Sequence, residues 1–177
     1  MDLEQVIISI GEKATDPWAK VTDAEFEVLE ANLDIPTVKC FYALALLINS
    51  SFRFGSLLRF EDYDEKQLKA FEFFNKALEE GEPLSLFYLA EVKCGLFGKF
   101  PMFPEDGKIL YQRYYDQTGD EETKDILDNW EEFLRDRKQH FDDLVLTERV
   151  RGLNLPQTGL GSHDDAYYES LSEDDED

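Results

Sequence analysis

Apolar side chains recur at intervals of three and four residues along most of this chain, a spacing typical of amphipathic helices. The clearest example lies between residues 64 and 98. Its first predicted helix has four apolar residues on one face: Ala70, Phe73, Phe74 and Ala77. Gly81 ends that helix and Pro83 opens a second one. The second helix carries another apolar set and closes near Gly95: Leu86, Tyr88, Leu89 and Ala90.

The same helix-turn-helix pattern begins again 38 residues further along the chain. Four positions of the first copy have a counterpart at this interval: Phe73 and Tyr111, Ala77 and Tyr115, Gly81 and Gly119, Leu89 and Leu127. A fixed period between about 20 and 50 residues is characteristic of solenoids built from stacked helix pairs. The pattern therefore predicts an all-α fold, a short α-solenoid of helix-turn-helix repeats.

The first copy resembles the Sel-one-like repeat, a relative of the tetratricopeptide repeat. The resemblance rests on Ala-Phe-Glu-Phe-Phe-Asn-Lys-Ala at residues 70–77, Gly81, Phe-Tyr-Leu-Ala at residues 87–90, and Gly95. It is good over residues 64–98, partial over residues 104–134 and faint before them. The resemblance implies an all-helical scaffold that binds other proteins and has no catalytic residues of its own.

The chain before residue 64 is interpreted as a degenerate first repeat. Residues 2–14 have the spacing of an amphipathic helix, although the run Val6-Ile7-Ile8 is also compatible with a strand. Thr22 and Glu25 have the spacing of a capping box, which predicts a helix over residues 23–33.

Pro36 suits the first turn of the following helix, where its missing N–H costs nothing. This helix is apolar on nearly every side, so we expect it to be central and the most buried. Setting Pro36 against Pro83 gives a spacing of 47 residues, which places extra residues in the loop of residues 50–65.

Near the C-terminus, Asp120 is placed to cap a long helix that runs to about Lys138, and a further short helix is predicted from Phe141 to Val150. These helices bring the expected total to about seven, in a helical repeat domain of residues 1–151. They also contain the only locally basic zone, which we expect to pair with the acidic body: Arg135, Arg137, Lys138, Arg149 and Arg151.

Residues 152–177 form a predicted acidic, flexible tail. Residues 163–177 contain eight acids and no lysine or arginine, so this segment has too little apolar surface to offset its ordering entropy. It is interpreted either as a solubilising end or as a segment that folds onto a basic groove.

The formal charge of the chain is -22, from 40 acidic and 18 basic residues. Such a charge disfavours binding to nucleic acid or anionic membranes, because its long-range field repels phosphate. Residues 1–162 alone carry -14, from 32 acids and 18 bases. We therefore expect a basic protein as partner, with no direct nucleic-acid or membrane binding. The oligomeric state stays open.

Residues suited to catalysis are few. Cys40 and Cys94 lie in apolar helical runs and are expected to be buried, reduced thiols, and His140 and His163 have no evident catalytic partner. No nucleotide-binding or metal-ligand motif is present, so we expect no enzymatic activity and no cofactor. The start of the chain has no basic region preceding an apolar one, so we expect no secretion signal and a cytoplasmic location.

Two aromatic loops and the tail are the candidate partner-binding segments. The loops cover residues 50–65 and 97–104, and their aromatic side chains either fold back onto the core or form an exposed contact surface. The candidate partner-binding residues are the loop phenylalanines and the acidic and aromatic residues of the tail: Phe52, Phe54, Phe100, Phe103, Asp164, Asp165, Tyr167, Tyr168, Glu169, Glu173, Asp174 and Asp175.

Three functions agree with these features. The first is an acidic inhibitor or immunity-type protein that neutralises a basic toxin or nuclease by direct binding. The second is a phage-type DNA mimic or anti-defence inhibitor, in which rows of carboxylates imitate phosphates. The third is a general adaptor that binds a peptide on its repeat face, with the charge serving only solubility.

Overall fold

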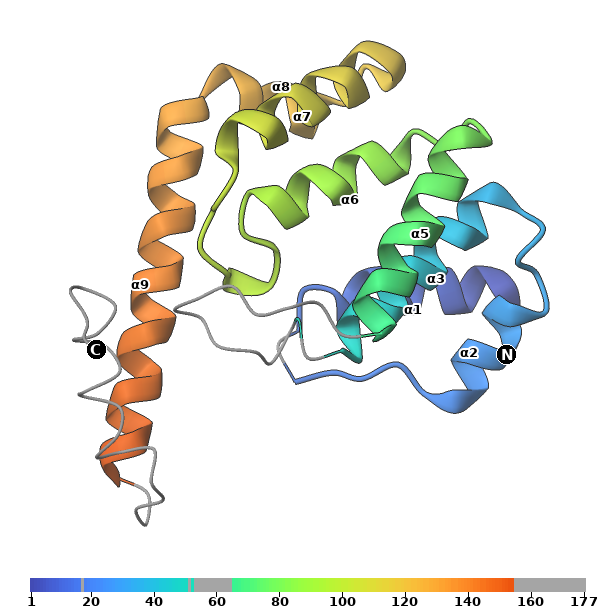
Figure 1. Cartoon of the computed structure of the whole chain (residues 1–177), viewed down its shortest axis with the longest axis horizontal. Helices are drawn as coiled ribbons and strands as arrows, with labels where there is room; N and C mark the ends of the chain where they lie inside the picture. The colour runs from blue at the N-terminus through green and yellow to red at the C-terminus, as the bar shows by residue number, and fades with distance from the viewer. Residues whose placement is uncertain (17, 51, 53–64, 155–177) are drawn as a thin grey trace.

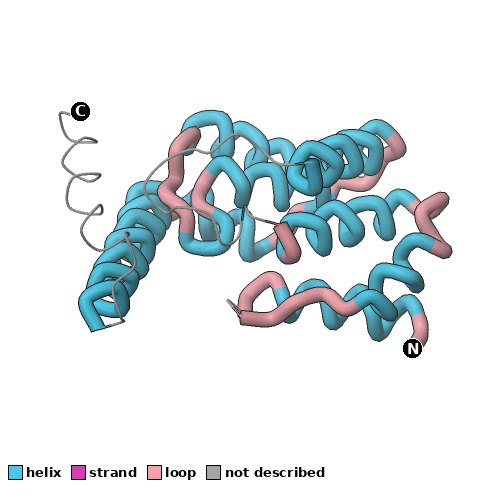
Figure 2. Tube along the Cα trace, turned by 60° about the horizontal axis from the view of Figure 1, so that its bottom comes forward, coloured by secondary structure: helices cyan, strands magenta, loops and turns pink. Residues whose placement is uncertain are grey.

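The computed structural model describes residues 1–16, 18–50, 52 and 65–154, with side chains through residue 147. Every regular element in these ranges is helical, as predicted (Figures 1 and 2). The elements are eight α-helices and one short 3-10 helix, η1 (Leu96–Gly98). Among the described residues, no helix is both long enough and apolar enough to cross a membrane.

The first two helices begin at predictable capping residues. Helix α1 (Leu3–Lys13) starts after Asp2, which forms a capping box with Gln5, and the structure thus selects helix over strand for this segment. Helix α2 (Asp23–Glu30) starts at the predicted capping box of Thr22 and Glu25. It ends at Glu30, three residues before the predicted end at Leu33. The Asn32 side chain donates to the Val28 carbonyl at 2.8 Å and so competes with the backbone hydrogen bonds that would continue the helix.

Helix α3 (Pro36–Ile48) is the centre of the molecule, as predicted. Ten of its thirteen residues are buried, and it packs on α1, α2, α5 (Glu65–Glu79) and α6 (Leu84–Lys93). Pro36 occupies the first turn. The main core forms around α3, and its largest fully buried side chains come from four helices: Val6, Ile10, Leu29, Val38, Leu44, Leu47, Ile48 and Phe74.

Both predicted copies of the repeat contain a pair of packed helices. Helices α5 and α6 pack together, and so do α7 (Pro104–Thr118) and α8 (Glu121–Asp128). Each first helix is followed by a glycine in the left-handed conformation, Gly81 with φ of +95° and Gly119 with φ of +67°. Helix α6 also packs on α7, so consecutive helices contact one another from α5 to α8.

Gly107 allows the close approach of α6 and α7. A Cβ atom at this position would lie 2.3 Å from the Cys94 sulfur and 3.2 Å from the Ala90 carbonyl oxygen. A second, smaller core forms beside this contact from four buried residues: Ala90, Cys94, Tyr111 and Trp130. Aromatic rings of α6, α7 and α9 (Trp130–Asn154) surround it.

The C-terminal helices differ from the prediction. Asp120 caps α8 as expected, but the helix ends at Asp128 rather than near Lys138. At the break, the Asn129 side chain donates to the Asp125 carbonyl at 3.0 Å, and the Trp130 ring then packs against Tyr111 and Phe133.

The two segments predicted on either side of residues 139–140 form one helix, because no glycine or proline separates them. Helix α9 runs for 25 residues and passes Gly152, the predicted start of the tail. It stands along one side of the other helices and extends beyond them (Figure 1).

Candidate interaction surfaces

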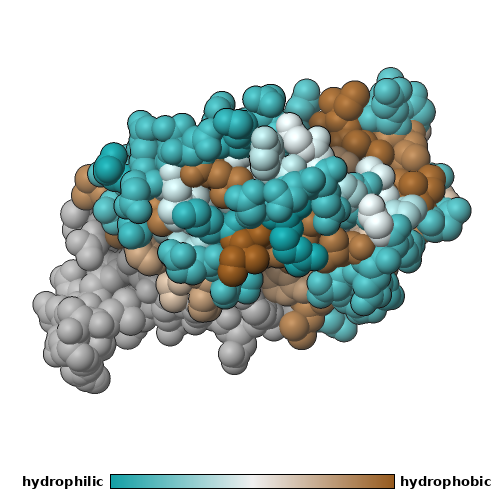
Figure 3. Space-filling model, turned by 90° about the horizontal axis from the view of Figure 1, so that it is seen from above, coloured by the Kyte–Doolittle hydropathy of each residue, from teal (hydrophilic) through white to brown (hydrophobic). Residues whose placement is uncertain are grey.

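An acidic surface lies over α8 and the first turn of α9. Its six exposed carboxylates are Glu121, Glu122, Asp125, Asp128, Glu131 and Glu132. Residues 120–134 contain seven acids and one base, Lys124, which pairs with Asp128 at 2.7 Å. The acidic residues in the first turn of each helix also stabilise it, because their negative charge interacts favourably with the positive end of the helix dipole. The surface is seen from the α7–α8 side in Figure 3, where hydrophilic residues cover most of the described face.

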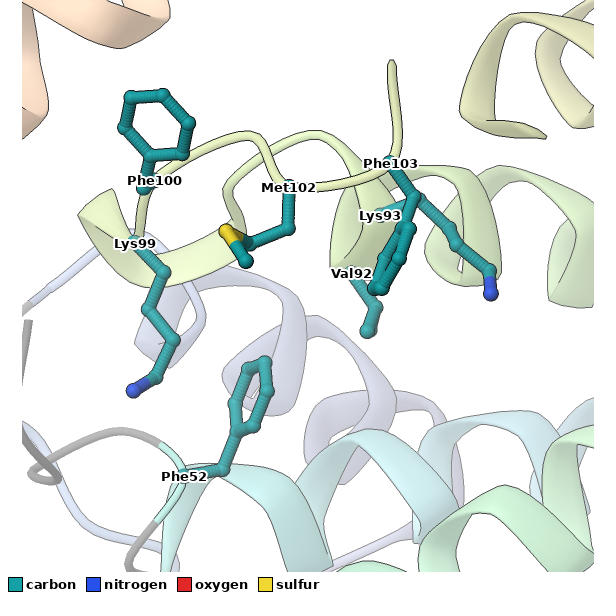
Figure 4. Close-up of a pocket in the computed structure, with 7 residues that line it drawn as sticks. All are labelled: Phe52, Val92, Lys93, Lys99, Phe100, Met102 and Phe103. Carbon is teal, nitrogen blue, oxygen red and sulfur yellow. The ribbon is translucent and has the colours of Figure 1, made fainter. Parts of the chain in front are cut away.

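A small cleft lies between the end of α6, the loop that follows η1, and Phe52 (Figure 4). Its lining is mainly apolar and includes two lysines: Phe52, Val92, Lys93, Lys99, Phe100, Met102 and Phe103. The Lys93 ammonium lies 5.1 Å from the centre of the Phe103 ring, and the Lys99 ammonium lies 5.1 Å from the centre of the Phe52 ring. Each of these two lysines therefore lies beside one aromatic ring of the lining.

The loop that forms one side of the cleft is held against both α6 and α9. The Phe103 amide donates to the Lys93 carbonyl at 3.1 Å, and the Phe100 ring packs edge-on against Phe141 of α9 at 5.3 Å. At Gly98, an added Cβ atom would lie 2.2 Å from a methyl carbon of Leu144. The backbone thus touches α9 directly, and this contact fixes the loop.

The predicted loop aromatics divide into two groups. Phe52 was expected to be an exposed contact residue, but it is only 6% exposed and belongs to the main core. Its ring packs against Phe97 at 6.1 Å, so it folds back as a plug. Phe100 and Phe103 are 38% and 43% exposed and line the cleft.

The remaining predicted partner-binding residues lie outside the described residues. They are Phe54 in the first loop and the tail positions: Asp164, Asp165, Tyr167, Tyr168, Glu169, Glu173, Asp174 and Asp175. Four further residues line the cleft and were not predicted from the sequence: Val92, Lys93, Lys99 and Met102. The only signal for them was their place in or beside the proline-containing aromatic loop.

The thiols have the environment of structural cysteines. Cys40 and Cys94 are buried and unpaired with each other, and burial raises the pKa of each to about 12. Both therefore remain protonated and unreactive at neutral pH. His140 is exposed on α9, and among the described residues no group of three or more His, Cys, Asp or Glu side chains is arranged to hold a metal ion.

A polar cluster fastens α9 to α6 and α7. Arg137 of α9 donates to both carboxylate oxygens of Glu91 at 3.0 and 3.1 Å, and to the Cys94 carbonyl at 3.2 Å. The Tyr111 hydroxyl donates to the same carboxylate. Burial raises the pKa of Tyr111, and the Glu91 charge raises it further, so the phenol stays a donor. Arg137 is thus one basic residue of the predicted zone that pairs with the acidic body.

A second ionic cluster joins α1 to α2. The buried Glu25 carboxylate accepts from the Lys13 ammonium at 2.6 Å and from Ser9 at 2.5 Å. Burial alone would raise the pKa of Glu25, but these donors and the Thr22 amide outweigh it and lower the pKa to about 2. Glu25 therefore completes the capping box of α2 and also links α1 to α2 as an ionised carboxylate.

Comparisons with known proteins give no relative from which a function can be transferred. No family model, no curated protein and no solved structure matches the chain.

Proposed function

We propose that this protein is a non-enzymatic protein-binding module that neutralises a basic protein, such as a toxin or nuclease, by direct binding. Its scaffold would be a short solenoid of Sel-one-like repeats. The observation that carries the proposal is the acidic surface, six exposed carboxylates over α8 and the start of α9. The scaffold is supported by the two helix pairs, α5 with α6 and α7 with α8, each turning at a left-handed glycine.

The charge favours a cationic partner over a neutral one. A surface of one sign steers an oppositely charged protein into encounter, and such steering raises association rates by factors of about 10 to 1,000. It also disfavours acidic competitors, because like charges at an interface are costly. The net charge of -22 extends this field over the whole molecule.

The scaffold holds the carboxylates in fixed positions. Asp120 caps α8 by accepting from the Thr123 amide at 2.9 Å, and the second core anchors the start of α9 through Trp130. A surface whose backbone is already ordered loses less entropy on binding than a flexible acidic segment. The two unpaired, buried thiols agree with action in the reducing cytoplasm.

The test is capture of partners from a lysate of the source cells, with the full chain as bait. We expect a protein of positive net charge to bind the unaltered chain and to be lost with E121Q/E122Q/D125N/E132Q, the surface variant. E4Q/E12Q/E27Q/D34N is the matched control, because it removes four exposed charges from α1, α2 and the turn after α2. Capture that survives in the surface variant, or that yields only acidic proteins, would overturn the proposal.

The same capture separates inhibition from DNA mimicry. Exposed carboxylates at residues 121, 125 and 128 follow one face of α8, an arrangement that also suits imitation of a phosphate row. A mimic would bind a nucleic-acid-binding enzyme, lose it steeply as salt rises, and compete with DNA for it. An inhibitor of a basic toxin would protect cells from that toxin without competing with DNA.

A further inference from the structure

Helix α9 has a face that contacts the other helices and a face that points to solvent. The contacting face uses side chains three or four residues apart: Trp130, Phe133, Arg137, Phe141 and Leu144. The opposite face is polar over residues 131–143, and its residues there are all exposed: Glu131, Glu132, Arg135, Asp136, Gln139, Asp142 and Asp143. Leu146 lies on this opposite face too, yet it is apolar and 61% exposed.

An apolar stripe begins at Leu146. The positions four and seven residues further along the same helix hold Val150 and Leu153. These intervals return to one face of a helix. The stripe lies in the part of α9 that extends beyond the other helices (Figure 1). The solvent face of α9 therefore changes from polar to apolar towards its free end, a pattern that indicates a covering segment.

We propose that the C-terminal segment of this same chain, residues 164–171, packs against the apolar stripe of α9. The segment reads Asp-Asp-Ala-Tyr-Tyr-Glu-Ser-Leu. Tyr167 and Leu171 are four residues apart, the same interval that separates Leu146 from Val150. One turn of helix in the segment would thus present an aromatic and an aliphatic side chain to the stripe.

Charge favours this occupant at the end of α9. Residues 144–154 contain two bases, Arg149 and Arg151, against one acid, Glu148. Residues 163–177 contain eight acids and no lysine or arginine. The carboxylates of Asp142 and Asp143 precede the stripe on the same face of α9 and repel an acidic segment. The contact is therefore confined to the last turns of the helix, next to the arginines.

The length of the chain permits this contact. Leu146 lies eight residues, or about 12 Å, before the end of α9 at Asn154. Thirteen residues lead from Asn154 to Tyr167, and an extended segment of that length spans up to about 43 Å. This connection contains the turn formers Pro156, Gly159 and Gly161. It also gives an effective local concentration in the millimolar range, so a weak contact is sufficient.

A second copy of the chain suits the stripe less well. An antiparallel pair that sets Leu146 against Val150 of the other copy brings the two Arg149 residues within about 3 Å along the helix axes, where their charges repel. A parallel pair places two acidic bodies side by side, each chain with a formal charge of -22. The C-terminal segment avoids both costs. The inference concerns α9 alone and does not depend on the identity of an external partner.

The test measures backbone order in the full chain by the heteronuclear ¹⁵N NOE, which reports motion on the picosecond to nanosecond timescale. We expect residues 167–171 to be as ordered as α9, and to become as mobile as residues 173–177 in Leu146→Ser and in Arg149→Glu. The matched controls are Ile109→Ser and Arg113→Glu on α7, which should leave the segment ordered. Ile109 is 60% exposed, close to the value for Leu146, and Arg113 is exposed.

A nitroxide at Ser172→Cys locates the contact, because the buried Cys40 and Cys94 do not compete for the label. It should broaden the amide signals of Leu146 and Thr147, and Y167S/L171S should remove this broadening.

Three results would overturn the inference. The first is a segment that is mobile in the unaltered chain, or that stays ordered in either Leu146→Ser or Arg149→Glu. The second is broadening at Leu146 that Y167S/L171S does not alter. The third is broadening of an isotope-labelled chain by a nitroxide on a separate, unlabelled chain, because the contact would then join two copies.

Discussion

The main core around α3 and the second core beside α9 exclude water in different ways. The main core is built from apolar side chains contributed by α1, α2, α3 and α5, whereas the second core borders the charged cluster of Glu91, Arg137 and Tyr111. Apolar burial is non-directional and scales with area, while a buried ion pair depends on geometry. Helix α3 therefore stabilises the fold as a whole, whereas the position of α9 depends on a few specific bonds.

The largest effect should come from a cavity in the main core. Leu44 is fully buried in α3, so Leu44→Ala should lower the free energy of unfolding by about 3 to 4 kcal/mol. In chemical denaturation, all helices of Leu44→Ala should unfold together at a lower denaturant concentration than those of the unaltered chain. Leu68→Ala, at a position 57% exposed on α5, is the control and should cost less than about 0.5 kcal/mol. Equal costs at the two positions would contradict the central place of α3.

A smaller and more local effect should follow from Arg137→Met. The substitution keeps an apolar stem but leaves the Glu91 carboxylate without its cation, at a cost of about 3 kcal/mol for a partly exposed pair. We expect faster hydrogen exchange in α9 while α3 keeps its protection. Arg135→Met makes the same change at an exposed position of the same helix and should leave exchange unaltered. Uniformly faster exchange in all helices would contradict this, because it would show that the Arg137–Glu91 pair stabilises the whole fold rather than α9 alone.

Disrupting the ionic cluster of Glu25 between α1 and α2 should have the smallest effect on stability, and this effect should depend on pH. Glu25→Gln should cost about 2 kcal/mol at neutral pH, because it removes the charge that Lys13 and Ser9 stabilise. The pKa of Glu25 is lowered from 4.5 to about 2, so its contribution is present above pH 4.5 and is lost as pH falls towards 2.

Unfolding curves measured from pH 7 to pH 2 should therefore converge for Glu25→Gln and the unaltered chain. Glu27→Gln changes an exposed carboxylate of the same helix and serves as control. A difference between Glu25→Gln and the unaltered chain that stays constant down to pH 2 would contradict the assigned pKa.

Much of the fold could be predicted because it depends on local chemistry. The capping box of Thr22 and Glu25, the first-turn proline Pro36 and the turn glycines act within a few residues of the chain. The apolar character of α3 on all sides likewise predicts its burial. The break at Asn129 was missed because it depends on the packing of Trp130 against Tyr111, a contact between distant segments.

The candidate surfaces were harder to predict. Phe52 and Phe100 look alike as loop aromatics, but Phe52 enters the main core and Phe100 remains partly exposed beside α9. The direction of each ring is set by neighbours that lie far away in the sequence. The two cleft lysines could not be predicted for the same reason, because each lies over an aromatic ring that only the folded structure brings next to it.

The measurement that tests the proposed function most directly is the association rate constant with the captured basic partner, followed by stopped flow at low and high salt. We expect fast association that slows at least about tenfold as salt rises, and a slower rate that depends less on salt for the surface variant E121Q/E122Q/D125N/E132Q. Equal rates and equal salt dependence for the two chains would contradict a role of the acidic surface in binding.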